Sequence, residues 1–163
     1  PLGGGRPSLI VVLVQKEVAE RVCAQPSPRP SPLGKGKKGE GMSTLSVAIQ
    51  YFGKPEIVAI VPRSAFWPVP AVDSAILRIE VGGTRSKLSF VSTDKAKLSE
   101  KRLFQIVRMG FSSRRKQLQN NLLAGLRLPR ERVLDGLKAV GLNPQVRAQD
   151  LTVEKWIELS RIL

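Results

Sequence analysis

The sequence predicts a mixed α/β fold in which a partial sheet with its helices is followed by a small all-helical domain. Apolar, β-branched runs alternate with helical patterns up to residue 81, whereas only helical patterns follow residue 93. A polar segment at 82–93 separates the two patterns. We therefore predict a sheet domain over 1–81, a linker over 82–93 and a helical domain over 94–163.

The first predicted strand, Leu9–Val14, is a continuous run of Leu, Ile and Val. Such runs are typical of parallel strands that are buried on both faces. The few residues before it cannot supply the neighbouring strands, so we expect the chain to be the C-terminal part of a longer protein. The strand leads into a predicted helix, Gln15–Cys23, in which Val18 and Val22 share one face.

Residues 25–42 are rich in proline, glycine and serine and carry an excess of lysine and arginine. A segment of this composition cannot bury enough apolar surface to order itself, so we predict a disordered surface insertion. It is either a linker without function, which we favour, or a basic arm that contacts phosphate.

Capping residues and helix breakers define the remaining elements. Ser43 can cap a helix over 44–52, and Thr152 can cap the last helix. Pro129 and Gly141 suit the first position and the end of the helix between them. The other predicted strands are Glu56–Val61 and Ser74–Val81, and the helices after the linker are Ser99–Met109, Ser113–Leu123 (capped by Ser112 or Ser113), Pro129–Val140 and Val153–Ile162.

Composition favours a nucleic-acid partner. The chain has 27 Lys and Arg against 13 Asp and Glu, a net charge of +14, which points to a polyanion. The alternative is a charge that serves only solubility. Histidine, the commonest general base and metal ligand, is absent, so we predict no metal site. The single cysteine, Cys23, excludes an internal disulfide and suggests a reducing compartment. No apolar run reaches the roughly 20 residues that span a bilayer.

The most informative segment is 66–74, Phe-Trp-Pro-Val-Pro-Ala-Val-Asp-Ser. Pro68 and Pro70 fix φ and lack an N–H, so they cannot lie in a central strand and predict a stiff, extended loop. A rigid loop that presents an aromatic ring suits a base held out of its stack. The alternative is a hairpin connection in which Phe66 and Trp67 fill the core.

A second candidate site is Arg114-Arg115-Lys116, at the start of a predicted helix. Cations are unfavourable at that end of the helix dipole, which suggests that an anion binds there together with backbone amides. The alternative is solvated charge over a helix that packs through Leu118 and Leu122.

Four segments together resemble the small-subunit rRNA adenine dimethyltransferases. The motifs Phe-x-Pro-x-Pro-x-Val-Asp-Ser and Phe-Ser-x-Arg-Arg-Lys are each fairly specific, and the likeness covers the chain except 1–7 and 25–42. It implies the C-terminal portion of a Rossmann-like methyltransferase sheet, followed by a helical rRNA-binding domain. The segments are Val14–Arg21, Leu45–Phe52, Val61–Ala75 and Phe104–Leu118.

The resemblance also implies roles for particular residues. Phe66, held by Pro68 and Pro70, would lie against an extruded target adenine, while Trp67 packs beneath the loop. The cofactor would be S-adenosyl-L-methionine, the partners small-subunit rRNA and the pre-30S particle, and the protein a cytoplasmic monomer with no membrane partner. The implied RNA-binding residues are Arg108, Arg114, Arg115 and Lys116.

The chain also departs from the family. We find neither its Gly-rich cofactor loop nor its Asn-Leu-Pro-Tyr-type catalytic motif, because Gly3-Gly4-Gly5 follows no strand and Asn143-Pro144 lacks the aromatic residue. We therefore expect no catalytic or cofactor-binding residue here, and a fragment that is inactive alone and binds no cofactor. Two alternatives remain: a non-enzymatic RNA-binding module, and a relative that acts on large-subunit rRNA, which fits the Phe-Ser-x-Arg-Arg-Lys helix less well.

Overall fold

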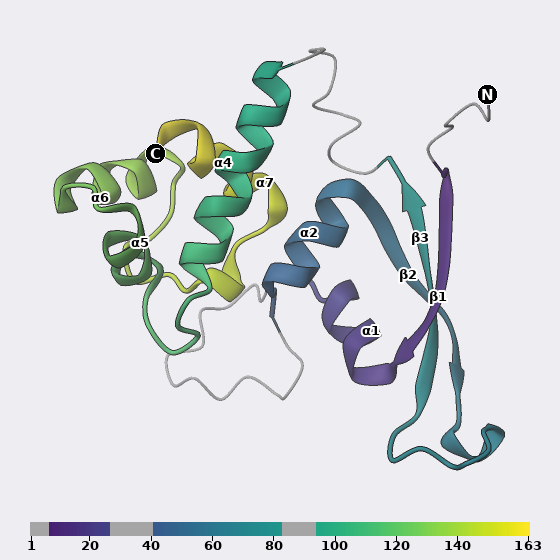
Figure 1. The fold of residues 1–163 in the computed structure, drawn as a ribbon. Coiled ribbons are helices and arrows are strands. Elements are labelled where there is room, and N and C mark those ends of the chain that lie inside the picture. The colour runs from purple at the N-terminus through teal and green to yellow at the C-terminus, as the bar shows by residue number, and fades with distance from the viewer. Residues whose placement is uncertain (1–6, 27–40, 83–93) are drawn as a thin grey trace.

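The computed structural model describes residues 7–26, 41–82 and 94–163, and these form a small sheet with two helices followed by a group of helices (Figure 1). The predicted α/β fold class is confirmed. Most of the predicted insertion (25–42) and linker (82–93) lies outside the described residues. The elements are β1 (Leu9–Gln15), α1 (Lys16–Cys23), α2 (Thr44–Phe52), β2 (Gly53–Val61), β3 (Ser74–Val81), α4 (Asp94–Gly110), α5 (Leu118–Leu126), α6 (Arg130–Ala139) and α7 (Val153–Ile162).

The sheet has the strand order β1-β3-β2, and β3 is antiparallel to both neighbours. Strands β1 and β2 therefore run in the same direction and end at the same edge of the sheet. Helices α1 and α2 cover one face (Figure 1). A small core holds this face together, made by Ala19, Val22, Ala75 and Leu77.

Strand β1 differs from its prediction as a parallel strand buried on both faces. It pairs antiparallel with β3, and its apolar side chains are exposed, Val11 by 58% and Leu13 by 53%. No described element covers the outer side of β1, and the few residues before this strand were not expected to supply its neighbours. A β-branched run favours a strand whose two faces are covered by other elements, and the described residues do not cover both faces of β1.

The two edges of the sheet differ in how well they resist pairing with another chain. The outer edge of β2 is interrupted by Pro55 and by the charged residues Lys54 and Glu56. It is interrupted further by a register shift between Ile57 and Ala59. All of these features discourage edge-to-edge association. Strand β1 has none of them, and its outer edge has no partner strand among the described residues.

We expect the isolated chain to self-associate through β1, in contrast to the monomer that the resemblance implies. Replacing Val11 and Leu13 together by lysine should shift sedimentation profiles at micromolar concentration toward the monomer, because charge blocks edge pairing. Val58→Lys on β2 is the control, since Val58 is also 58% exposed. Equal effects of both variants would show that β1 is not the associating edge.

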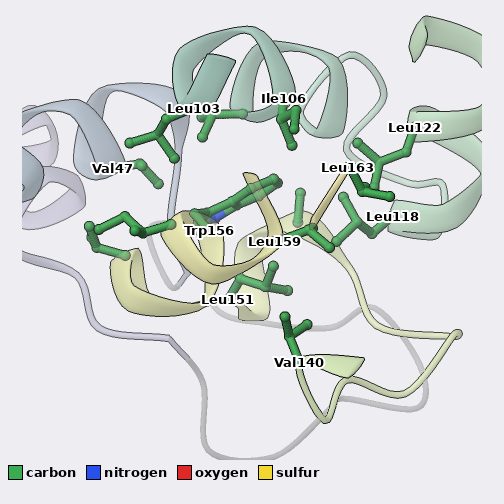
Figure 2. Close-up of a cluster of buried hydrophobic side chains, with 14 of the residues drawn as sticks. Val47, Leu103, Ile106, Leu118, Leu122, Val140, Leu151, Trp156, Leu159 and Leu163 are labelled. Carbon is green, nitrogen blue, oxygen red and sulfur yellow. The ribbon is translucent and has the colours of Figure 1, made fainter. Parts of the chain in front are cut away.

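The helices α4 to α7 pack around Trp156, which is fully buried (Figure 2). Met42, Val47 and Tyr51, which lie in or just before α2, belong to the same core. Helix α2 therefore touches both the sheet and the helical group, and the division at 82–93 stays a prediction. The expected caps of α2 and α7 are confirmed, since Ser43 Oγ accepts a hydrogen bond from Ser46 N and Thr152 Oγ1 accepts one from Lys155 N.

Candidate nucleic-acid interface

The Pro-rich loop lies at the sheet edge where β1 and β2 both end. It connects β2 to β3 over residues 62–73 and extends beyond the sheet (Figure 1). Ligands of open α/β sheets commonly bind outside the carboxyl ends of such parallel-running strands. The position of the loop therefore makes this edge the first candidate site.

Asp73 fastens both ends of the loop. Its Oδ1 accepts a hydrogen bond from Arg63 N at 2.9 Å, and its carbonyl oxygen accepts one from Lys16 N at 3.0 Å. The side-chain hydrogen bond thus joins the two ends of the loop. The backbone hydrogen bond joins the loop to the junction of β1 and α1. The sequence marked Asp73 only as the end of the loop and missed this role, although an aspartate that follows a proline-rich turn is a recognisable signal.

The two aromatic residues of the loop have different environments. Phe66 is half-buried, has extended backbone angles (φ −117°, ψ 151°) and belongs to neither hydrophobic core. Trp67 is 95% exposed, so the expectation that it packs beneath the loop was wrong. The surrounding residues therefore cover part of the Phe66 ring and leave the Trp67 ring in solvent. Pro68 is exposed and Pro70 half-buried, and neither lies in a strand.

An open depression of about 460 Å³ lies beside the base of the loop. It brings together the two exposed cations Lys16 and Arg63 with the carboxylates of Glu17, Glu20 and Asp73. Such a mixed lining can bind a polar group through hydrogen bonds and offers cations to a phosphate. The described residues contain no group of side chains that could hold a metal ion.

The described residues do not fit a nucleotide-type cofactor. Such cofactors are commonly held by a glycine-rich turn between a strand and the N-terminus of a helix. Here β1 passes directly into α1 at Gln15 and Lys16, without a glycine. We therefore derive no step of chemistry through S-adenosylmethionine from these residues.

A second depression, of about 410 Å³, lies between the sheet part and the start of α7 and includes Cys23. Burial is the main cause that raises the pKa of the Cys23 thiol above its ordinary value. A raised pKa keeps the thiol protonated and poorly nucleophilic at neutral pH. We therefore assign no catalytic role to Cys23.

The predicted basic site lies in a turn between α4 and α5. Arg114, Arg115 and Lys116 are all exposed and precede the first residue of α5, Leu118. The predicted helix Ser113–Leu123 corresponds to α5, but its predicted start and its serine caps were wrong. The helix begins at Leu118, and Gln117 precedes it without a side-chain cap. The helix dipole is therefore weaker support for an anion bound at these three cations, because its effect falls off beyond the first turn of a helix.

Buried Asn121 explains why the helix starts late. Its Nδ2 donates hydrogen bonds to the carbonyl oxygens of Gly110 (2.6 Å) and Ser113 (2.9 Å). These two bonds hold the chain after α4 in a turn, and the amide of Leu118 donates to Val146 O at 2.8 Å. Sequence reasoning missed Asn121, because a single asparagine in a helical pattern does not indicate its partners.

The structure places the two candidate sites on the same side of the molecule without bringing them into contact. In Figure 1 the turn after α4 and the loop after β2 both lie at the lower side, with α1 between them. Arg108, the fourth predicted RNA-binding residue, is exposed near the end of α4. A chain-like polyanion could follow such an arrangement. No helix among the described residues is long and apolar enough to cross a membrane.

Comparison with known proteins decides the family. A family model described as ribosomal RNA adenine dimethylase matches residues 5–163. The chain belongs to the ribosomal RNA adenine dimethylase family. Two curated relatives are both named ribosomal RNA small subunit methyltransferase A. The Nostoc punctiforme relative is 38% identical to this chain, and the Dehalococcoides mccartyi (strain BAV1) relative is 36% identical. Each alignment covers 94% of this chain and 46% of the relative. This member of the dimethylase family thus spans about half the length of those relatives.

Two solved structures share the fold of this dimethylase-family chain. A dimethyladenosine transferase from Plasmodium falciparum aligns with a TM-score of 0.66 at 23% identity, over 95% of this chain and 57% of that protein. The 23S rRNA methyltransferase ErmE aligns with a TM-score of 0.59 at 24% identity, over 96% and 55%. At these identities the likeness supports the Rossmann-like methyltransferase fold and nothing finer.

Proposed function

We propose that this chain is the RNA-facing part of an S-adenosylmethionine-dependent small-subunit rRNA adenine dimethyltransferase. The complete enzyme would dimethylate N6 of two adjacent adenines near the 3′ end of the small-subunit rRNA, during assembly of the small subunit in the cytoplasm. The observation that carries the proposal is the loop of Phe66, fastened by Asp73 at the carboxyl edge of the sheet in a chain of this family.

In this proposal the chain binds and positions RNA. The target adenine leaves its stack and lies against Phe66, a contact worth about 1–3 kcal/mol. Pro68 and Pro70 restrict the loop, so little conformational entropy is lost when the base binds. The cations of the turn after α4 and Arg108 bind phosphates and set the register of the RNA. The cofactor and the groups that act on the adenine amine would belong to a part of the enzyme that this chain does not contain.

The test is to complete the enzyme. The upstream part of the Nostoc punctiforme relative, up to the start of the aligned region, is joined to this chain and incubated with undermethylated small subunits. We expect dimethyladenosine near the 3′ end of the small-subunit rRNA, detected by mass spectrometry. Product only in large-subunit rRNA would favour a relative acting there, and RNA binding without product would favour a non-enzymatic module.

The chain alone should not bind S-adenosylmethionine. The described residues lack the glycine-rich turn that would hold it. The Gly-x-Gly-x-x-Gly pattern at 34–39 follows a proline-rich segment and not a predicted strand, so it does not match such a turn. Isothermal titration calorimetry of the 163-residue chain should give no heat of binding, with the completed enzyme as the positive control. Micromolar binding by the chain alone would contradict this prediction.

Phosphate contacts at the turn after α4 should appear in the salt dependence of RNA binding. Replacing Arg114, Arg115 and Lys116 by alanine should lower the slope of log K against log salt by roughly 2–3, because about one counterion is released per phosphate contact. Fluorescence anisotropy of a labelled rRNA hairpin measures the slope. The matched control replaces three exposed cations of α6, Arg130, Arg132 and Lys138, by alanine. An equal change in both variants would mean that charge alone, and not this turn, sets the slope.

A further inference from the structure

Trp67 is the most exposed large apolar side chain of the described residues. Its exposed fraction is 95%, whereas the other tryptophan, Trp156, is 0% exposed. None of the ring contacts within the described residues involves Trp67. A fully solvated indole does little for folding stability, and large exposed aromatic side chains are typical of binding surfaces.

The loop holds this indole in a restricted position. Pro68 follows it directly and Asp73 closes the loop, so the backbone at Trp67 has little freedom. Phe66 is half-buried whereas Trp67 is 95% exposed, so the two rings lie in different environments. The loop therefore presents a second aromatic ring, fully open to solvent, directly after Phe66.

The surroundings favour a nucleobase over a protein surface. Arg63 lies in the same loop and Lys16 at its base, both exposed, and the whole chain carries a net charge of +14. An exposed aromatic ring on a loop that also carries a cation, in a chain of this net charge, is a combination by which proteins hold single-stranded nucleic acid, with stacking for the base and charge for the backbone. The apolar neighbours Val69 and Val72 are only 56% and 47% exposed and extend the patch little.

We propose that Trp67 is a second stacking platform, which takes an unpaired nucleobase next to the adenine that lies on Phe66. The inference rests on the proposed function and assigns it a further positioning residue. The RNA strand crosses the loop with one base on each ring. The neighbouring base would be bound whether or not the adenine has reached Phe66, so Trp67 acts on affinity and on register.

The test uses the intrinsic fluorescence of the 163-residue chain. Trp67→Phe leaves only the emission of buried Trp156, so the difference from the parent chain reports Trp67. The probe is a hairpin RNA whose loop contains two adjacent unpaired adenines, and inorganic polyphosphate is the control for charge alone. We expect RNA to quench most of the Trp67 emission and to protect it from acrylamide, and polyphosphate to do neither.

Substitutions extend the test. Trp67→Ala should weaken hairpin binding at least roughly fivefold, the lower bound of base stacking, and Trp67→Phe should lose less because it keeps an aromatic face. Val69→Ala in the same loop is the matched control and should change affinity less than twofold. Abasic nucleotides in place of all the loop bases should remove the quenching, which a purely structural role of Trp67 would not explain.

The outcomes separate this proposal from the function on which it rests. If the labelled hairpin binds but Trp67 emission stays unchanged, the stacking platform is wrong and RNA binding stands. If no RNA binds even at low salt, both proposals fail. If the emission of Trp67 shifts to shorter wavelength with protein concentration and ignores RNA, a second protein chain covers the indole and the stacking proposal is overturned.

Discussion

Replacing Phe66 by alanine should lower methyl transfer by the completed enzyme roughly 5- to 150-fold, while RNA affinity changes far less. Many cationic contacts share the affinity, whereas one ring holds the reacting base. A stack of about 1–3 kcal/mol that forms only with the extruded adenine acts mainly on the rate. The measurement compares single-turnover methylation with hairpin affinity for the same variant.

Three further substitutions distinguish stacking at Phe66 from packing. Phe66→Tyr and Phe66→Trp should retain much of the activity, because each keeps an aromatic face. Phe66→Leu keeps the bulk and apolar character but should behave like alanine. Equal activity of the leucine and tyrosine variants would mean that Phe66 only packs against the sheet, as a hairpin connection would require.

Replacing Trp156 by alanine should lower the free energy of unfolding by about 3–5 kcal/mol, the usual cost of deleting a large buried aromatic side chain. Trp156 is fully buried and lies among Val47, Leu103 and Leu159 at the centre of the helical core (Figure 2). Its ring also packs against Phe111, with 5.5 Å between the centroids. Urea unfolding followed by circular dichroism measures the loss.

The chain supplies its own control for this prediction. Trp67→Ala removes the same side chain from an exposed position and should change stability by less than about 0.5 kcal/mol. Gly110→Ala perturbs the core in the opposite sense, because a Cβ there would overlap the Trp156 ring, and should also destabilise. A loss below about 1 kcal/mol for Trp156→Ala would show that the helices do not depend on this core.

Much of the candidate site could be predicted from the sequence. Pro68 and Pro70 exclude a central strand wherever they stand, so the loop followed from local chemistry alone. The order of strands and helices followed from hydrophobic period, and Ser43 and Thr152 marked helix starts because a capping side chain bonds within three residues of itself. The net charge of +14 indicated a polyanionic partner without any structure.

Only the tertiary structure decided which surfaces these elements present. The exposure of β1 depends on which elements lie beside it. The basic turn depends on the hydrogen bonds that Asn121 donates to Gly110 and Ser113. The outward position of Trp67 depends on the loop that Asp73 closes. Local sequence fixes backbone preference through interactions between near neighbours. Burial and side-chain partners arise from contacts between residues distant in the chain, which no local pattern encodes.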